Sequence, residues 1–405
     1  MPAADRSGGA GLYLHIPFCS AICPYCDFSV LTGGAEARER FVHDLLREIE
    51  LWSPEREGPR RDGPGRGEGW SGAAFDTVYL GGGTPSALAP EQLGRILAAV
   101  AQHLPVVAEP WIQLEANPED VEPSTLQAWR RLGIDTVSLG VQSFDPHALA
   151  FLGRRHDGET ARRSVSLAQD AGFHTVSLDL IFGWPEQTPE RWEADLEQAL
   201  ALAPQHLSCY QLTLHEGTPF GFRQRRGELR EMPEDQQAVL FIQAHERLAA
   251  GGLVGYEVSN FARSPEHQSR HNRKYWHHVP YLGLGPSAHS FDGRRRWWNV
   301  RKVGPWQRQL QAGQRPVDEV EQLGPQELAL EAVFLGLRTA RGLDLDWVEE
   351  LSGLDLEPAN AVLFEAWEER GQVRRPARWR GRRLVPTLEG WAVADALAAA
   401  VETDP

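Results

Sequence analysis

The sequence predicts an α/β fold, in which a partial (β/α)6 TIM-like barrel is followed by a small winged-helix-like domain at the C-terminal end. Six short apolar runs alternate with five helical patterns over the first half of the chain, which is typical of repeated βαβ units and a parallel sheet. Right-handed crossovers curl such a sheet into a barrel, although a doubly wound sheet is also compatible with the pattern. The repeats end after about residue 215.

Each element of the barrel follows from its local pattern. Strands are expected at 11–16, 75–80, 111–115, 136–139, 174–180 and 206–212. Helices are expected between them at 36–52, 90–103, 123–132, 158–171 and 189–202. Residues 54–69 contain only glycine, proline and charged residues, so we expect a flexible surface insertion there.

The pattern beyond the repeats is different. A long helix is expected at 234–250, followed by YEVSNFA (256–262) and a loop of polar and aromatic residues over 263–300. Helical patterns then lie at 325–340, 344–352 and 358–370, followed by β-runs at 373–379 and 382–385 and a final helix from Thr387. We therefore expect a barrel core over 1–230, a segment that completes it over 231–315, and the winged-helix-like domain over 316–405.

Composition narrows the classes of partner. The formal net charge of −15 argues against a general binder of nucleic acid or anionic membranes. Six arginines nevertheless mark the predicted C-terminal hairpin: Arg374, Arg375, Arg378, Arg380, Arg382 and Arg383. The acidic chain around them favours a solvated or docking hairpin over contact with DNA, so no nucleic-acid partner is expected. No run of 18 apolar residues and no apolar leader occur, which favours a cytoplasmic protein.

Three of the four cysteines lie close together, at Cys19, Cys23 and Cys26, in the segment GLYLHIPFCSAICPYCDFS. This spacing suits metal ligands rather than disulfides, and Cys209 alone suits a buried small side chain. Iron–sulfur clusters normally take four thiolates, so three leave one iron of a [4Fe–4S] cluster open. The amino and carboxylate groups of S-adenosylmethionine (SAM) can occupy that iron, and the reduced cluster can then cleave SAM to a 5′-deoxyadenosyl radical. A zinc site with His15 as fourth ligand is the weaker alternative.

Further motifs give the chain a family resemblance. YLHIPFCSAICPYCDF is similar to the cluster loop of the radical SAM proteins related to oxygen-independent coproporphyrinogen III oxidase. The resemblance continues through GGGTPS (81–86), LEANP (114–118), GVQSF (140–144), LGRRH (152–156), DLIFGWPEQT (179–188), YEVSNFA, HNRKYW (271–276) and YLGLGPSAHS (281–290). It implies a radical SAM core in which the three cysteines hold the cluster.

The resemblance also implies which residues contact SAM: Tyr13, Tyr25, Gly82, Gly83, Thr84, Glu115, Gln142, Arg154 and Asp179. The glycine-rich turn leaves backbone amides free for the methionine part. Glu115 suits an ammonium or a ribose hydroxyl, and Arg154 suits a carboxylate. Each residue could instead be an ordinary polar residue at a strand end, but these positions recur strand after strand.

Members of this family differ in function, and three functions remain open for this chain. They are the oxidase, which decarboxylates two propionates of coproporphyrinogen III, a haem chaperone that delivers haem, and a haem-modifying methyltransferase-like relative. Phe28 stands where the oxidase pattern carries a further cysteine, and HNRKYW resembles an HNxxYW motif associated with haem binding in the chaperones. Both features favour the chaperone, and no catalytic residue or radical reaction is assigned.

The haem-binding residues expected from this motif are His271, Asn272, Tyr275 and Trp276. Imidazole can ligate iron, flat aromatic side chains can cover a porphyrin, and Arg270, Arg273 and Lys274 could pair with propionates. Other histidines could ligate iron instead, namely His156, His277, His278 and His289. The expected partners are haem and a haem-accepting respiratory protein, with transient contact to a membrane protein. A monomer and a weak dimer are both compatible.

Overall fold

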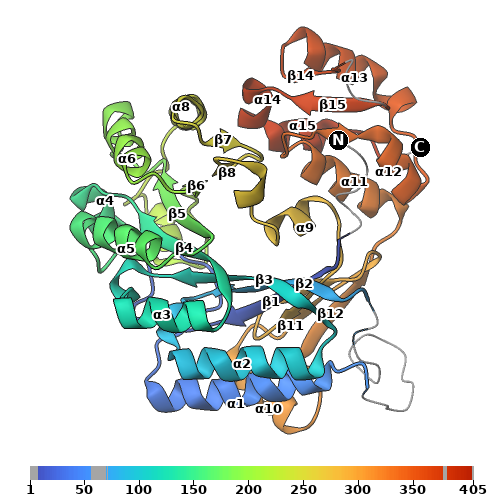
Figure 1. Ribbon diagram of the computed structural model, residues 1–405. Coiled ribbons are helices and arrows are strands. Elements are labelled where there is room, and N and C mark those ends of the chain that lie inside the picture. Colours follow the sequence, from blue (N-terminus) through green and yellow to red (C-terminus); the bar gives the residue numbers. More distant parts are fainter. Residues whose placement is uncertain (1–7, 56–69, 71, 377–380, 404–405) are drawn as a thin grey trace.

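The computed structural model describes residues 8–55, 70, 72–376 and 381–403. Within these residues, twelve strands form one sheet in the order β12-β11-β10-β9-β1-β2-β3-β4-β5-β6-β8-β7, and three more form a second sheet in the order β13-β15-β14 (Figure 1). In the same described part of the chain, no helix is long and apolar enough to cross a bilayer.

The centre of the large sheet is a run of six parallel strands in sequence order. They are β1 (Ala10–Ile16), β2 (Phe75–Gly82), β3 (Val106–Ala116), β4 (Ile134–Gln142), β5 (Thr175–Phe182) and β6 (His206–Gln211). A doubly wound sheet would reverse its strand order partway, whereas this order never reverses. The predicted partial (β/α)6 barrel is therefore confirmed, and the doubly wound alternative is excluded.

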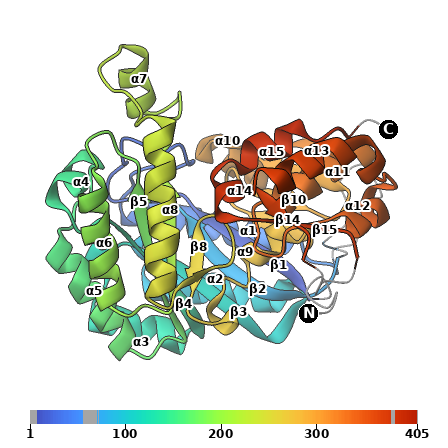
Figure 2. The same cartoon turned by 90° about the horizontal axis from the view of Figure 1, so that it is seen from above.

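Helices cover the outer face of these strands, as Figures 1 and 2 show. They are α1 (Ala35–Leu51), α2 (Pro90–His103), α3 (Pro123–Arg131), α4 (Pro146–Phe151), α5 (Gly158–Asp170), α6 (Pro189–Ala201) and α8 (Glu234–Ala250). Several begin where the sequence signals a start: Pro90 and Pro123 are first helical residues, and the side chains of Asp157 and Thr188 accept from backbone amides of the first turn. The short helices α4 and α7 (Pro219–Arg225) were not predicted.

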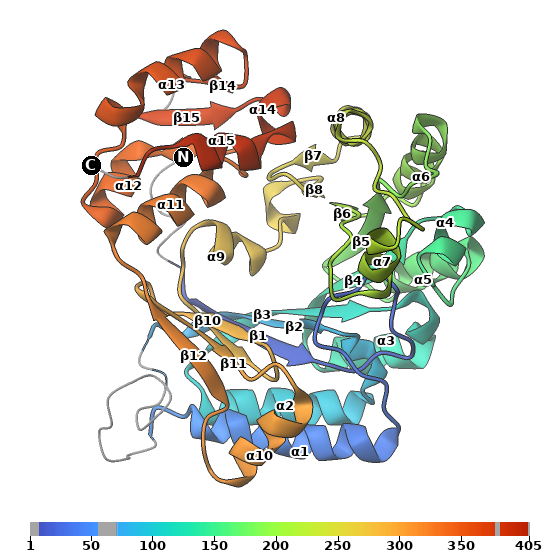
Figure 3. The same cartoon turned by 180° about the vertical axis from the view of Figure 1, so that it is seen from behind.

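The prediction of one continuous loop over 263–300 is wrong, because the segment contains a helix and three strands. It contains α9 (Asn272–Trp276), β9 (Tyr281–Leu284), β10 (His289–Phe291) and β11 (Arg295–Asn299). Strand β9 pairs in parallel with β1, and β10, β11 and β12 (Val317–Gln322) extend the sheet towards the C-terminal module (Figure 3). These strands are short, and HSF (β10), RRWWN (β11) and VDEVEQ (β12) lack the aliphatic run that identifies a buried strand.

The remaining elements of the large sheet lie at its other edge and beside it. Strands β7 (Val254–Gly255) and β8 (Asn260–Ala262) follow β6. Helix α10 (Val303–Gln311) packs against α1. Three single turns of 3-10 helix complete this part, at Pro85–Ala87, Pro118–Asp120 and Pro265–His267.

The C-terminal module has the element order of a winged helix, helix–strand–helix–helix–strand–strand. These elements are α11 (Pro325–Gly336), β13 (Leu343–Asp344), α12 (Leu345–Ser352), α13 (Glu357–Glu369), β14 (Val373–Arg374) and β15 (Arg383–Pro386). A separate hydrophobic core lies within residues 329–401. The expected final helix is two helices, α14 (Leu388–Ala392) and α15 (Ala394–Ala400), because Val393 leaves the helical conformation. The domain boundaries near 230 and 315 stay predictions.

The arginines of the C-terminal hairpin are balanced by nearby carboxylates. Arg382 pairs with four of them, including Asp346 at 2.8 Å and Asp355 at 2.6 Å. Arg375 pairs with Glu357, and Arg383 pairs with Asp344. Two of the six arginines, Arg378 and Arg380, lie outside the described residues, as does nearly all of the predicted flexible insertion, at 56–69.

One buried carboxylate joins the first helix to the far side of the sheet. Glu48 of α1 is fully buried, and it accepts hydrogen bonds from the Gly285 amide at 2.8 Å, Asn299 Nδ2 at 2.6 Å and Trp306 Nε1 at 3.0 Å. These donors come from the loop after β9, from β11 and from α10. Burial raises the pKa of Glu48 to about 7, because the charged form loses its hydration.

Glu48→Ala is expected to lower the unfolding free energy by about 3–5 kcal/mol, because it removes the acceptor of three buried donors, of which Asn299 alone keeps a second acceptor, the Gly285 carbonyl. Glu50→Ala, on the exposed side of the same helix, is the control and should cost less than about 0.5 kcal/mol. Denaturant unfolding of the three proteins under identical conditions measures both values. A Glu48→Ala protein as stable as the control would show that the network is dispensable.

The same residue predicts a pH dependence. The folded pKa of Glu48 lies above the ordinary value of 4.5, so the folded state holds the proton more tightly than the unfolded state. Its contribution is full below 4.5 and is lost as the pH rises to about 7. In Glu48→Gln this titration is absent, so the stability of the parent protein relative to that variant should fall across the same interval. A constant difference would contradict the raised pKa.

Candidate functional site

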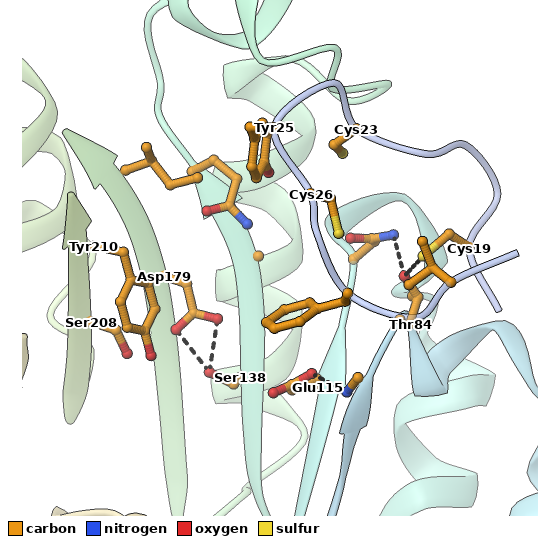
Figure 4. A pocket seen from close by; sticks show the side chains of 18 of the residues that line it. Cys19, Cys23, Tyr25, Cys26, Thr84, Glu115, Ser138, Asp179, Ser208 and Tyr210 are labelled. Atoms are coloured by element: carbon orange, nitrogen blue, oxygen red, sulfur yellow. Dashed lines mark hydrogen bonds between the residues drawn. The ribbon is translucent and has the colours of Figure 1, made fainter. Parts of the chain in front are cut away.

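A cavity of about 590 Å³ opens at the C-terminal ends of the parallel strands. The loop after β1 lines one side of it, and β2 to β6 line the opposite side (Figure 4). Active sites of α/β barrels are found at this end of the strands. The cavity brings together the predicted cysteines and most of the residues expected to contact SAM.

The three cysteines are free thiols on one loop, and all three line the cavity. Hydrogen bonds hold the loop: the Cys19 amide donates to the Leu31 carbonyl at 3.0 Å, and Arg301 Nη2 donates to the Asp27 carbonyl at 2.6 Å. Within the described ranges, no three His, Cys, Asp or Glu side chains are gathered closely enough to hold a single metal ion. The loop therefore presents its thiols separately to the cavity.

His15, the fourth ligand in the zinc alternative, is used elsewhere. Its Nε2 lies 2.9 Å from the Ser29 carbonyl, and its Nδ1 lies 3.2 Å from the Tyr13 hydroxyl. Burial also lowers the pKa of His15, so the ring is neutral. Both nitrogens would have to give up these contacts to ligate a metal with the thiols.

The surroundings of the thiols fit an iron–sulfur cluster. Burial raises the pKa of Cys19, and it raises that of Cys26 to about 11, so these two thiols are protonated until a metal binds them. Arg154 Nη1 lies 3.4 Å from Cys23 Sγ, and Thr84 Oγ1 lies 3.5 Å from Cys19 Sγ. The buried Nε of Arg154 has no hydrogen-bond partner among the described residues. These donors suit sulfur and carboxylate groups of a bound cofactor.

Glu115, at the end of β3, is held by two donors. The Tyr79 hydroxyl donates to Oε1 at 2.6 Å, and the Gly82 amide donates to Oε2 at 3.1 Å. Burial raises the pKa of Glu115 to about 7. Gly82 has a φ of +108°, and a Cβ there would meet His15 Nδ1 at 2.5 Å, so only glycine fits. Gly83 and Thr84 follow it and also line the cavity.

The later strands place the other predicted SAM contacts in the same cavity. Asp179 of β5 accepts from the Ser138 hydroxyl at 3.1 Å, and burial raises its pKa to about 6. Gln142 ends β4 with a φ of +66°, a backbone strain that is common at functional sites. Arg154 donates to Asn117 Oδ1 at 2.7 Å and to the Gly140 carbonyl at 3.0 Å, which orients its guanidinium.

Tyr25 and Tyr13 differ in their placement. Tyr25 lines the cavity from the cysteine loop, with its ring 6.5 Å from that of Phe220. The Tyr13 hydroxyl is directed to His15 instead, and the Tyr13 ring packs 6.0 Å from that of Tyr79. Tyr13 therefore supports the wall behind Glu115 rather than forming the lining.

Several lining residues were missed from the sequence. They include Tyr79, Gln113, Asn117, Ser138, His206, Ser208, Tyr210, His215 and Asn260. A signal was present, because residues of β4, β5 and β6 alternate between apolar and polar, as in TVSL and LSCY. Side chains on a strand point alternately to the two faces of a sheet, so polar residues such as Ser138, Asp179 and Ser208 share the face that lines the cavity.

The HNRKYW motif lies beside the cavity, and its histidine is already bonded. His271 is buried, with Nδ1 2.9 Å from the Thr77 hydroxyl and Nε2 2.8 Å from the Tyr275 hydroxyl. Burial lowers the pKa of His271 to about 3. Iron coordination by His271, which stays a prediction, would break one of these bonds. Asn272 lines the cavity, and the indole Nε1 of Trp276 has no hydrogen-bond partner within the described residues.

The cations and other histidines near the motif also have defined contacts. Arg270 stacks 3.9 Å from the Trp111 ring, and Lys274 pairs with Asp76 at 2.5 Å. His156 has both ring nitrogens bonded, to Glu119 and to the Val141 carbonyl. His289 stacks on Trp298, with ring centroids 5.5 Å apart.

Comparisons with known proteins agree with this geometry. Residues 69–199 match the Radical SAM superfamily, and residues 323–393 match the HemN C-terminal domain. The structure is similar to that of coproporphyrinogen III oxidase (HemN) from Escherichia coli, with a TM-score of 0.80, 21% identity, and coverage of 96% of this chain and 89% of that one. At this identity the similarity establishes the fold alone.

Relatives found by sequence share a higher identity with this chain than HemN does. The heme chaperone HemW of Mycobacterium tuberculosis is 35% identical over 390 residues, which cover 96% of this chain and 93% of the relative. HemW of E. coli is 37% identical over 69% of each chain. Radical S-adenosyl methionine domain-containing protein 1, mitochondrial, of mouse is 33% identical over 97% of this chain and 87% of its own. The chain therefore belongs to the HemW family of radical SAM proteins, a superfamily that implies a [4Fe–4S] cluster and SAM.

Proposed function

We propose that this protein is a haem chaperone, which binds haem and transfers it to an acceptor protein while carrying a [4Fe–4S] cluster and SAM. The observation that carries the proposal is the cavity, where three free thiols face the polar ends of five strands in a chain 35% identical to a heme chaperone over 96% of its length.

Within this proposal Cys19, Cys23 and Cys26 ligate the cluster, and SAM occupies the space between them and the strand ends. Two half-buried carboxylates, Glu115 and Asp179, lie on the side of the cavity opposite the cysteine loop (Figure 4). Carboxylates suit the ammonium and ribose hydroxyls of SAM, and its positive sulfonium is favoured between them. Arg154 suits its carboxylate, and Gly82, Gly83 and Thr84 suit the methionine backbone.

The competing function is oxidative decarboxylation of coproporphyrinogen III. The position two residues after Cys26 argues against it, because Phe28 occupies it and its side chain is 63% exposed at the mouth of the cavity. Phenylalanine cannot supply a thiol there. An exposed aromatic face can instead cover a flat apolar ligand.

The cellular setting completes the proposal. The acceptor would be a respiratory haem protein, contact with a membrane-bound acceptor would be transient, and the chaperone would work in the cytoplasm as a monomer or weak dimer. Haem delivery needs an acceptor that can approach the cavity, and the mouth of the cavity carries exposed side chains from two loops.

Cys23→Ala is expected to abolish assembly of the [4Fe–4S] cluster, because two thiolates and SAM cannot hold four irons. Iron and acid-labile sulfide are measured after anaerobic reconstitution. Cys209→Ala is the control, since Cys209 is buried on β6 outside the cysteine loop, and it should retain the content of the parent chain. Full iron and sulfide in Cys23→Ala would refute the ligand assignment.

Glu115→Gln is expected to weaken SAM binding by about 10- to 100-fold, since a hydrogen bond to a charged group contributes about 1.5–3 kcal/mol. Equilibrium dialysis of SAM against the reconstituted protein gives the dissociation constant. The exposed Glu122 supplies the control, Glu122→Gln, with an unchanged constant. If Glu115→Gln bound SAM as tightly as Glu122→Gln does, SAM would have to lie away from β3.

The chaperone itself is tested by comparing two ligands. The reconstituted chain with SAM and a reductant should leave coproporphyrinogen III unchanged, and the same preparation should bind ferric haem with a defined Soret spectrum and pass it to a haem-free acceptor. Catalytic formation of the divinyl product would identify an oxidase. Failure to bind haem at micromolar concentration would reject the chaperone.

A further inference from the structure

The proposed function leaves the position of haem open, and the charges in the cavity restrict it. Glu115 and Asp179 lie half-buried on its inner side. Among the described residues that line it, Arg154 is the one arginine or lysine, and it faces Cys23. The raised pKa values of these two carboxyl groups show that negative charge is disfavoured there, and a haem that entered with its two propionates inward would add more of it. The inner side therefore suits a cation such as SAM, and haem needs another surface.

Two histidines line the cavity, and only the outer one is accessible. His206 has both ring nitrogens bonded, to the Ser177 hydroxyl at 2.7 Å and the Tyr256 hydroxyl at 2.9 Å. The His215 side chain is 48% exposed, and its Nδ1 lies 3.7 Å from Asp27 Oδ2. Its Nε2 has no hydrogen-bond partner in the described part of the chain. Asp27 lies at ion-pair rather than hydrogen-bond distance from Nδ1, and Nε2 is left for a metal.

Exposed apolar side chains stand on the same rim. Ile22 and Phe28, from the cysteine loop, are 51% and 63% exposed. Both line the cavity together with His215. Exposed apolar groups gathered around a cavity are typical of a ligand surface. A porphyrin presents a wide apolar face that matches this arrangement.

Two arginines flank the rim and are free of carboxylates. Arg225, at the end of α7, donates to the Glu216 carbonyl at 2.8 Å, next to His215. Arg301 donates to the Asp27 carbonyl at 2.6 Å, next to Phe28. Within the described residues neither guanidinium is paired with a carboxylate, in a chain whose net charge is −15. Figure 2 shows α7 standing out from the body of the protein, where a ligand and an acceptor can reach it.

We propose that haem binds at this outer rim, with His215 Nε2 ligating the iron, Phe28 and Ile22 packing on the porphyrin, and Arg225 and Arg301 pairing with the propionates. The proposal rests on the chaperone function and specifies its haem site. It moves the iron ligand from the HNRKYW motif, whose histidine joins α9 to β2, to the loop between β6 and α7. The bound haem then lies at the surface, beside the cysteine loop, where an acceptor can remove it.

The test is a titration of the reconstituted full chain with ferric haem, followed by absorption and electron paramagnetic resonance spectra. His215→Ala is expected to weaken haem binding by about tenfold or more and to lose the signature of an imidazole ligand, and added imidazole should restore that signature. His147→Ala removes an exposed histidine of α4 and should leave both properties unchanged. Iron and sulfide content confirms that each variant is assembled.

A second pair of measurements tests the propionate contacts. Arg225→Glu together with Arg301→Glu should weaken binding of haem by about tenfold or more, and should leave binding of haem dimethyl ester, which lacks the propionate charges, nearly unchanged. Equal losses for both ligands would overturn this part of the proposal.

The outcomes separate the two proposals. If the parent chain fails to bind haem, the chaperone function is rejected. If the parent chain binds haem and His215→Ala keeps the affinity and the imidazole signature, the function stands and the rim site is overturned. Loss of the signature in His271→Ala or His289→Ala, with His215→Ala unaffected, would assign the iron to that histidine instead.

Discussion

Side-chain alternation along six parallel strands is the constraint on which the site depends. Helices cover the outer face of the sheet, so one face must be apolar, and Leu12, Leu14 and Ile16 of β1 are completely buried there. The intervening positions face inward. Pairing in register then brings polar side chains of neighbouring strands level with one another, as with Glu115 beside Ser138 and Asp179 beside Ser208. A shift of one residue in any strand would exchange the two faces.

This constraint produces a cavity with two different halves. The inner half holds two half-buried carboxylates with raised pKa values, and it is suited to a cation that also carries hydrogen-bonding groups. The outer half consists of loops after the strands, with exposed aromatic and aliphatic side chains and an accessible imidazole. Beside it lie the guanidinium groups of Arg225 and Arg301, which have no carboxylate partner among the described residues. Two ligands of opposite charge can therefore share one cavity without competing for the same contacts.

The HNRKYW motif has a clear structural role in this arrangement. His271 joins α9 to β2 through Thr77, and its ring lies 5.2 Å from that of Tyr79, which holds Glu115. Lys274 pairs with Asp76 of the same strand. On the other side, the Tyr275 ring packs against Tyr281 of β9, so the motif connects the wall of the cavity to the sheet near the C-terminal module. The resemblance of this segment to the HNxxYW motif is thus compatible with a supporting role.

Sequence alone determined the barrel, its helices and the cysteine loop, because these features are local. Strand and helix periodicity, helix-starting residues and cysteine spacing are all contained within short windows, and α2 and α8 begin and end where their patterns predict. The family motifs also identified Glu115, Gln142, Arg154 and Asp179, which the structure places in one cavity. Short strands such as β9 to β11 could not be identified, because their pairing with β1 and with one another, rather than their own composition, makes them strands.

Only the tertiary structure decided which polar atoms are already bonded and which are free. The sequence offers 14 histidines of equal chemical type. Folding buries His271 against Thr77 and Tyr275. It leaves His215 exposed beside Asp27. Availability of a ring nitrogen depends on contacts between distant segments, which no local pattern encodes. Spacing could therefore locate the chemistry of the cysteines, whereas the haem ligand could be argued only from packing and charge.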